Sequence, residues 1–325
     1  MPRFDLPLED LRSFAPVVRE PDDFDDFWSA TLGESREVAS PVKVGPADGL
    51  VCTVESRDVR FSGFAGERIA GWLTTPRDIS TLRGGVVQFV GYGGGRGMAH
   101  DHLAWASAGY AHLVMDSRGQ GSGWSMGDTP DPWGAGPSVP GMMTRGIEDP
   151  QAYYYRRLIT DAALAVDALR SLDLVSPADV AVIGGSQGGG LALAAAGLVP
   201  DVRALIADVP FLCHFERAVG FTDAAPYSEI RDYLRIHRGA AATVFETLAY
   251  FDGVNFAKRA QAPALFSAGL EDFVCPPSTV FAAHNTYGGS AAIDVFPFNA
   301  HEGGGAERWP RLASWLAETP RAESR

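Results

Sequence analysis

The sequence has few cysteines and no long apolar run. Its three cysteines, Cys52, Cys213 and Cys275, are widely spaced and odd in number, which argues against a disulfide framework and against a zinc site. No apolar stretch approaches the length that crosses a bilayer. Residues 1–14 alternate apolar and charged side chains and lack the apolar core of a signal peptide. We therefore expect a cytoplasmic protein that does not depend on disulfides.

Positive charge is also scarce. Lysine and arginine number 27 against 40 aspartates and glutamates, which leaves a net charge of -13. Nucleic acid and anionic membrane surfaces both require a basic face, so neither is an expected partner. With 325 residues, 46% hydrophobic and 21% charged, the chain has the composition of an ordinary globular protein and can bury a large core.

The chain alternates short apolar runs with helical segments. Such alternation predicts an α/β fold in which a mostly parallel, doubly wound sheet is covered by helices. We expect one domain over residues 1–325, with an acidic N-terminal capping segment (1–45) and a helical insertion (210–258) between late strands. The predicted core strands are 85–90, 111–115, 180–183, 204–209, 264–268 and 293–298, and antiparallel strands are expected at 51–61 and 69–75. The predicted helices are 21–35, 105–109, 153–172, 191–197, 279–286 and 306–317.

The stretch 180–197 carries the strongest catalytic motif. A β-branched run ends in Gly184-Gly185-Ser186-Gln187-Gly188, and a small apolar helix follows. This is the pattern of a nucleophile elbow, where glycines allow strand and helix to approach closely around a strained serine. A second match, Gly123-Trp124-Ser125-Met126-Gly127, precedes Asp128-Thr129-Pro130, which cannot start a helix. Ser186 is therefore the predicted nucleophile, and Ser125 is not.

A serine nucleophile needs a base, and the base needs an acid that orients it. In α/β-hydrolases these partners follow the serine in the order acid, then histidine, on loops after later strands. His301 follows the last predicted strand in a turn-like context, although a surface loop histidine is the alternative reading. Asp272 follows strand 264–268, and the segment 274–277, with its two prolines, would fix its turn. Glu271 and Asp208 are rival acids, and a solvated loop carboxylate is the alternative.

Backbone donors for an oxyanion are expected at two places. The N–H of Gln187 opens the helix beside Ser186, and the N–H of Tyr92 lies in the glycine-rich loop 91–97 after a buried strand. Such loops are common after strands. A phosphate-binding loop is a weaker interpretation here, because the Lys-Ser/Thr ending of that motif is missing. The long Gly- and Pro-rich loop 119–150, which includes Trp124 and Trp133, is predicted to be functional.

Together these motifs resemble the acetyl xylan esterase and cephalosporin C deacetylase family (carbohydrate esterase family seven) of the α/β-hydrolase superfamily. The similarity runs in order from about residue 60 to residue 310. The signature elements are Arg118-Gly119-Gln120, Gly184-Gly185-Ser186-Gln187-Gly188 and His301-Glu302. Further matches are the loop 91–97, the segments Met143-Thr144-Arg145-Gly146-Ile147 and Tyr153-Tyr154-Tyr155-Arg156-Arg157, Asp208-Val209-Pro210-Phe211, and Asp272-Phe273-Val274-Cys275-Pro276-Pro277.

The resemblance implies a metal-free, cofactor-free serine esterase. Members remove O-linked acetyl groups from small sugars and cephalosporin C, can use hydrogen peroxide in place of water, and form homohexamers with enclosed active sites. By position, Ser186, Asp272 and His301 would form the triad, and Tyr92 and Gln187 the oxyanion hole. Tyr92, Pro210 and Phe211 would wall the acyl side for a small-molecule acetyl ester, and Arg118 would be a structural tie. A serine peptidase and a non-catalytic binding protein on the same fold are the rival functions.

Overall fold

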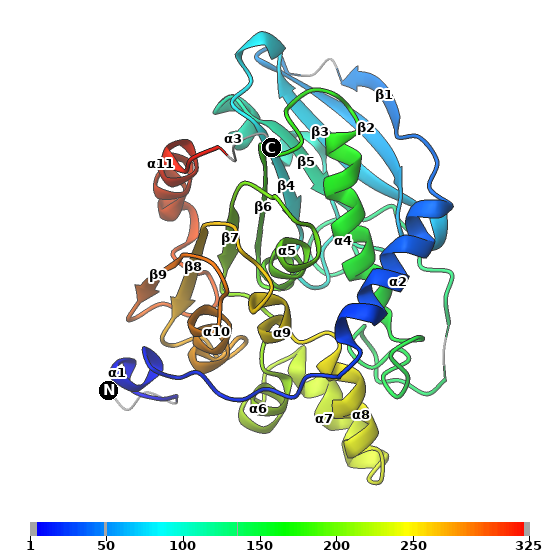
Figure 1. The fold of residues 1–325 in the computed structure, drawn as a ribbon, viewed down its shortest axis with the longest axis vertical. Coiled ribbons are helices and arrows are strands. Elements are labelled where there is room, and N and C mark those ends of the chain that lie inside the picture. The colour runs from blue at the N-terminus through cyan, green and yellow to red at the C-terminus, as the bar shows by residue number, and fades with distance from the viewer. Residues whose placement is uncertain (1–4, 49–50, 135, 322–325) are drawn as a thin grey trace.

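A single twisted sheet organises the molecule (Figure 1). The computed structural model describes residues 5–48, 51–134 and 136–321. The strand order is β1-β2-β3-β5-β4-β6-β7-β8-β9. Strands β4 to β9 run parallel, and β1, β2 and β3 add antiparallel pairs at one edge. The strands are β1 (Lys43–Asp48), β2 (Val54–Ser62), β3 (Arg68–Pro76), β4 (Gly85–Phe89), β5 (Ala111–Met115), β6 (Val180–Gly185), β7 (Leu205–Asp208), β8 (Ala264–Gly269) and β9 (Ala291–Phe296). The mostly parallel sheet predicted from the sequence is confirmed.

Strand β1 is the one strand of this sheet that the sequence pattern does not predict. Its six residues include Gly45 and Pro46, which are both uncommon in strands. The strand tolerates them because it lies at the edge of the sheet, where its register with β2 shifts between Val44 and Ala47. Pairing with β2, rather than local preference, therefore decides its conformation.

Two helical layers cover the sheet. One face carries α4 (Tyr154–Arg170), α5 (Gln187–Leu198), α9 (Gly253–Ala257) and α10 (Pro277–Asn285), and the other carries α3 (Ala104–Ser107) and α11 (Trp309–Glu318) (Figure 1). Side chains alternate between the layers along each strand, as a pleated strand requires. On β6, Val182 belongs to the larger core under α4 and α5, whereas Ile183 belongs to the smaller core under α3 and α11.

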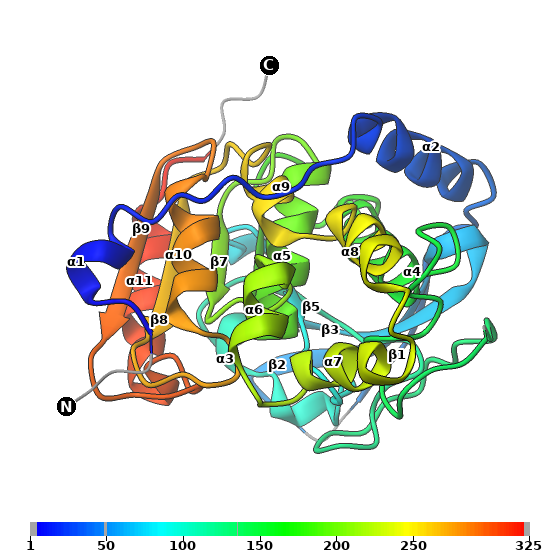
Figure 2. The same ribbon diagram turned by 90° about the horizontal axis from the view of Figure 1, so that it is seen from below.

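Between β7 and the short helix α9, the chain forms three further helices: α6 (Phe215–Phe221), α7 (Tyr227–Ile236) and α8 (Ala241–Ala249) (Figure 2). They fill most of the segment 210–258 that the sequence marks as a helical insertion. The short helix α9 ends this segment and packs closely on α5, where a Cβ at Gly197 would lie 2.7 Å from the carbonyl oxygen of Phe256. The final turn of the predicted insertion therefore belongs to the helical layer on the sheet.

The N-terminal segment crosses the helical face (Figure 2). Helix α1 (Leu8–Leu11) lies beside α10, and α2 (Phe24–Glu37) buries Phe24, Phe27 and Trp28, around which the sequence predicts a helix. The Trp28 ring packs edge-on against Phe251 and Phe256, and its indole N–H donates to the carbonyl of Tyr250. Residues 1–4 of the predicted capping segment lie outside the described residues. Within the described ranges, no helix is both long and apolar enough to cross a bilayer.

Candidate active site

Ser186 lies on a strained turn between β6 and α5. Its φ of 55° and ψ of -123° are sparsely populated for a residue with a side chain. Glycines surround it because the backbones nearly touch: a Cβ at Gly184 would lie 2.2 Å from the carbonyl carbon of Gly188, and a Cβ at Gly188 would lie 2.2 Å from the oxygen of Phe89. The Ser186 N–H donates to the Asp208 carbonyl at 2.9 Å. The local geometry is the elbow that the glycine spacing predicts.

The structure brings Ser186, His301 and Asp272 together. The two ring nitrogens of His301 lie 2.9 Å from Ser186 Oγ (Nε2) and 2.8 Å from Asp272 Oδ2 (Nδ1). The carboxylate accepts a hydrogen bond from Nδ1–H, which leaves the lone pair of Nε2 free to accept the serine proton. Asp272 is fully buried, and its second oxygen accepts the N–H groups of Val274 and Cys275 at 2.8 and 2.9 Å, so the turn holds the acid as the sequence predicts.

The rival acids are engaged elsewhere. Asp208 pairs with Arg308, which sits in a short 3₁₀ turn (Gly305–Arg308) before α11, and accepts a hydrogen bond from Ser267. In the described part of the chain no hydrogen bond or ion pair joins Glu271 to His301, and the Glu271 backbone N–H donates to the carbonyl of Asn299. His301 therefore meets Asp272 alone among the three candidate carboxylates.

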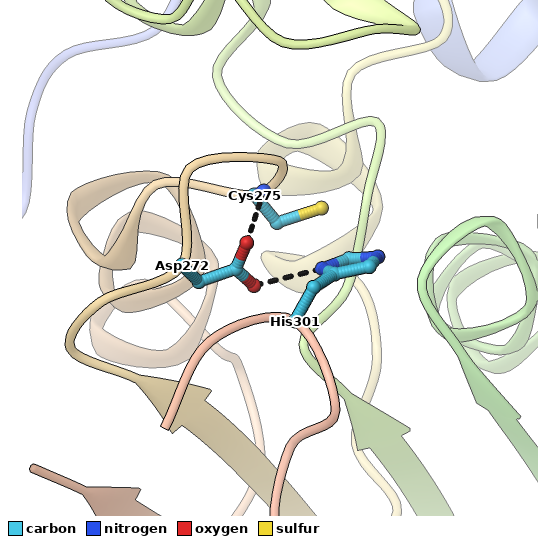
Figure 3. Close-up of side chains that lie close together, drawn as sticks. All are labelled: Asp272, Cys275 and His301. Carbon is cyan, nitrogen blue, oxygen red and sulfur yellow. Dashed lines mark hydrogen bonds and ion pairs between the residues drawn. The ribbon is translucent and has the colours of Figure 1, made fainter. Parts of the chain in front are cut away.

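Cys275 lies beside the triad, in the same turn as Asp272 (Figure 3). Burial raises the pKa of its thiol well above the ordinary value, against the smaller opposing effect of the Ser186 hydroxyl next to it. Asp272, Cys275 and His301 offer atoms within 4.8 Å of one another that could bind a metal ion. An ion held by all three would have to displace the Asp272–His301 hydrogen bond. Asp272 and His301 thus belong to the hydrogen-bonded triad with Ser186, and the neutral thiol of Cys275 lies beside that triad.

The loop after β4 passes directly beside the nucleophile. A Cβ at Gly91 would lie 4.0 Å from that of Ser186, which brings the backbone of Tyr92 next to the serine. Neither Tyr92 nor Gln187 donates its backbone N–H to another residue in the described part of the chain. These two N–H groups are therefore available to the oxyanion that forms when Ser186 attacks a carbonyl group. Their catalytic role stays a prediction.

Side-chain amides beneath this loop hold it in place. The Gln187 side chain is fully buried; its oxygen accepts from Tyr155 and from Gln120, both at 2.9 Å, and its nitrogen donates to the carbonyl of Val90. The Gln120 oxygen accepts the N–H of Gly93 at 2.7 Å. Because the Gln120 nitrogen also donates to the Tyr154 hydroxyl at 2.9 Å, Gln120 links the loop to helix α4 and to the start of α5. The sequence motif marks Gln120 but does not reveal this role, since its partners come from distant segments.

The Tyr92 ring is anchored by the helical insertion. Its hydroxyl donates to Glu229 of α7 at 2.7 Å and accepts the N–H of Met142 at 2.6 Å. Burial raises the pKa of Glu229, and the Tyr92 hydroxyl bond partly offsets this. The ring of Phe211 packs edge-on against that of Tyr92, but Phe211 and Pro210 are both buried, so substrate contact with either stays a prediction.

Trp124, which belongs to the second GxSxG motif (residues 123–127), lies against the loop that carries Tyr92. Its indole N–H donates to the Tyr92 carbonyl at 2.9 Å, and 66% of its surface is exposed. The ring covers Gly94, where a Cβ would lie 2.4 Å from it, and it comes within 3.5 Å of a Cβ placed at Gly91. That Ser125 is not the nucleophile stays a prediction, but the tryptophan of its motif packs on the loop that runs beside Ser186. The sequence indicated a role for Trp124 only through its place in the long loop 119–150, which is predicted to be functional.

Arg118 lies beneath the site and is fully buried. Its guanidinium binds Asp161 of α4 through two bonds of 2.5 and 2.8 Å, pairs with Glu67 and lies 3.5 Å from Asp131. Asp161 also accepts the N–H of Phe64. Arg118 ties the loop after β5 to α4 and to the β2–β3 connection, as the sequence analysis predicts.

Comparisons with known proteins point to one family. The family profile described as acetyl xylan esterase (AXE1) matches residues 1–319. The fold superposes on the acetyl xylan esterase of Paenibacillus sp. R4 with a TM-score of 0.88 and 37% identity, covering 95% of this chain and 99% of that one. The acetyl xylan esterase 1 of Thermoanaerobacterium sp. JW/SL YS485 gives a TM-score of 0.88 and 34% identity over 96% and 98%. The acetyl esterase Axe7A of Xylanibacter ruminicola is 29% identical over 297 residues, and the match covers 88% of this chain but only 64% of that relative's length.

Proposed function

Because the chain belongs to the acetyl xylan esterase family, a family of carboxylic ester hydrolases, we propose that it removes O-linked acetyl groups from small carbohydrates, acetylated xylo-oligosaccharides above all. The observation that carries the proposal is the hydrogen-bonded chain Ser186–His301–Asp272 beside two free backbone N–H groups. Such a chain makes a serine hydroxyl nucleophilic at neutral pH.

The reaction proceeds in two halves. His301 Nε2 takes the proton of Ser186 as Oγ attacks the acetyl carbonyl, and the oxyanion is stabilised by the N–H groups of Tyr92 and Gln187. His301 then gives its proton to the sugar oxygen, the alcohol leaves and an acetyl-enzyme remains on Ser186. Water repeats the attack with His301 as base, and acetate is released. Asp272 orients His301 and stabilises its charged form in both halves.

Two finer parts of the proposal, activity on cephalosporin C and assembly into a homohexamer, rest on the family resemblance. A cytoplasmic location and the absence of nucleic acid and membrane partners rest on the composition and the N-terminal sequence. The net charge of -13 supports the last point. The crowding of the Tyr92 loop by Trp124 and Phe211 supports a preference for acetyl over longer acyl groups, since overpacking typically costs about 1–3 kcal/mol.

The test is acetate release from acetylated xylobiose by the purified chain and two serine variants. Ser186→Ala should lower kcat by roughly 10⁴-fold or more, because members of a triad act as a unit. Ser125→Ala is the matched control, since it alters the second GxSxG motif, and it should keep wild-type kcat. A Ser125→Ala variant without activity, beside an active Ser186→Ala, would reverse the assignment.

Two further assays separate the rival functions. Cleavage of aminoacyl amides faster than of acetyl esters would identify a peptidase. Failure of an organophosphonate to label Ser186 in the folded protein, together with no acetate release, would identify a non-catalytic binding protein.

A further inference from the structure

The N-terminal segment 5–14 is bonded to both ends of helix α10. At the end of the helix, the side-chain amide of Asn285 donates to two backbone carbonyls of this segment, at 2.9 and 3.0 Å. At the start of the helix, the backbone N–H of Ser278 donates to the carboxylate of Asp5 at 2.8 Å. Helix α1, which lies within the segment, packs beside α10 (Figure 2). The segment is therefore fixed to the helix that directly follows the turn of the catalytic acid.

Asp5 supplies the cap that α10 lacks in its own sequence. The residue before the helix is Pro276, which has no side-chain acceptor for the free N–H groups of the first turn. The Asp5 side chain, with 1% of its surface exposed, brings a carboxylate to this position from 273 residues away. A negative charge at the start of a helix is favourable, because the helix dipole is positive there.

Arg217 of α6 joins the same contact. Its guanidinium donates to the Asp5 carboxylate at 2.8 Å and to the Ser278 hydroxyl at 2.5 Å. The guanidinium also lies over the rings of Phe14 and Phe221, which hold it in place. We call Asp5, Arg217 and Ser278 the Asp5 cluster. It joins three separate parts of the chain at the first turn of α10.

One short turn connects this cluster to the catalytic acid. The turn runs from Asp272 to Ser278, and the N–H groups of Val274 and Cys275 within it donate to the Asp272 carboxylate (Figure 3). Two consecutive prolines then lead into α10 and leave the backbone few alternative conformations. A shift in the first turn of the helix is therefore passed to the two N–H groups that orient the carboxylate.

We propose that Asp5 is a positioning residue for the triad. Through the Asp5 cluster it fixes the turn that orients Asp272, and with it the hydrogen bond from Asp272 to His301. Asp5 touches no reacting atom, and nothing in the sequence pattern connects it with the triad. The inference rests on the proposed function for its turnover measurement alone. A purely structural Asp5 would affect the stability of the fold and leave the reactivity of the folded site unchanged.

The first experiment is Asp5→Asn, which keeps the size of the side chain. Its amide nitrogen donates, so it cannot replace a carboxylate oxygen that faces Arg217 or Ser278. We expect kcat on an aryl acetate to fall roughly ten- to a hundredfold, because a misplacement of about 1 Å can cost about 10²-fold. The loss stays below that of a missing triad residue, since Thr222 still donates to the carbonyl of residue 273.

The rate at which an organophosphonate labels Ser186 is the second readout, and it needs no turnover. It should fall by about the same factor as kcat in Asp5→Asn, because both depend on the same activated serine. If the wild-type chain releases no acetate, the proposed function fails, and the labelling rates still decide the role of Asp5. Wild-type kcat and labelling rate in folded Asp5→Asn would overturn the proposal.

Asn285→Ala is the matched control, because it releases the same segment at the opposite end of the same helix. It should lower the midpoint of urea unfolding, as Asp5→Asn does, but keep the wild-type kcat and labelling rate. Equal kinetic losses in the two variants would contradict a specific effect of the Asp5 cluster on the triad.

Arg217→Lys tests the cluster from its other side and serves if Asp5→Asn does not fold. Lysine keeps the positive charge but cannot bond Asp5 and Ser278 through separate nitrogens of one planar group. Its labelling rate should fall in the same direction as that of Asp5→Asn, and a wild-type rate would overturn the proposal. In the double variant the two losses should not multiply, because both act through one turn. Losses that multiply would show two independent effects and contradict the cluster.

Discussion

Tyr92 serves the site through two different groups, one on its backbone and one on its ring. The N–H is a proposed oxyanion donor, whereas the hydroxyl bridges Glu229 and Met142. Tyr92→Phe keeps the N–H, so kcat on an aryl acetate should fall by less than about tenfold, well below the 10²–10³-fold loss typical of a removed oxyanion donor. The unfolding free energy should fall by about 1–3 kcal/mol, because Glu229 and the Met142 N–H each lose a partner.

The control for this variant is Tyr287→Phe. Its hydroxyl donates to the carbonyl of Ala262, away from Ser186, so stability should drop without any change in kcat. A loss in kcat of about a hundredfold or more in folded Tyr92→Phe would show that the hydroxyl itself acts in the reaction.

Trp124 fixes the Tyr92 backbone from the solvent side. Trp124→Phe removes the N–H that the Tyr92 carbonyl accepts and retains a ring over Gly94. One neutral hydrogen bond is worth about 0.5–1.5 kcal/mol, so kcat/KM should fall roughly two- to tenfold if this bond orients the oxyanion donor. Trp133→Phe makes the same change in the same loop, where the lost bond is to Glu67, and should leave kcat/KM at the wild-type value. Indistinguishable kinetics of the two variants would mean that Trp124 does not position Tyr92.

At the scale of elements, the loop after β5 depends on one buried ion cluster. Arg118 and Asp161 are both fully buried, and removing one of them leaves the charge of the other unpaired in the interior. We expect Arg118→Met to lower the unfolding free energy, measured in urea, by about 3–5 kcal/mol. The double variant Arg118→Met/Asp161→Asn should recover part of that loss, since no buried charge is then unpaired.

The same variant tests whether Arg118 is a structural tie rather than a catalytic group. Folded Arg118→Met should keep kcat within about tenfold of the wild-type value, because no atom of Arg118 contacts the triad. A catalytic loss of three orders of magnitude in a folded protein would be incompatible with a purely structural role.

At the scale of the whole molecule, buried neutral histidines set the response to acid. Burial, with a smaller effect of His102 nearby, lowers the pKa of His112 from 6.5 to about 3. Below pH 6.5 the unfolded chain takes up a proton that the folded protein refuses, so the unfolding free energy falls as the pH drops towards 3. The slope for this one group approaches about 1.4 kcal/mol per pH unit. His214, whose pKa burial lowers to about 4, adds a similar loss over a narrower window.

The measurement is the unfolding free energy between pH 7 and pH 4 for wild type and His112→Gln. The variant should lose stability less steeply with falling pH, because glutamine takes up no proton. His100→Gln alters an exposed histidine and should follow the wild-type curve. Parallel curves for wild type and His112→Gln would show that His112 does not contribute to acid unfolding.

The sequence by itself determined the features that depend on neighbouring residues. A Cβ at Gly184 would meet the backbone of Gly188, four residues along the chain, so glycine is required within the elbow itself and the nucleophile could be predicted from the motif. Apolar runs marked the core strands because a parallel sheet is buried on both faces. The order of serine, acid and histidine along the chain then reduced the number of candidates for the acid and the base, since parallel strands bring their carboxyl ends to one edge of the sheet.

Only the tertiary structure decided what depends on contacts between distant segments. Glu229 binds the Tyr92 hydroxyl although the two residues are 137 positions apart in the sequence. Asp208 forms an ion pair with Arg308, so Asp208 is not the acid that orients His301. Trp124 binds the Tyr92 carbonyl from a loop without regular structure, and β1 forms by pairing with β2. In each case the stabilising contacts join segments far apart in the sequence and form only as the chain folds, so a local sequence pattern does not predict them.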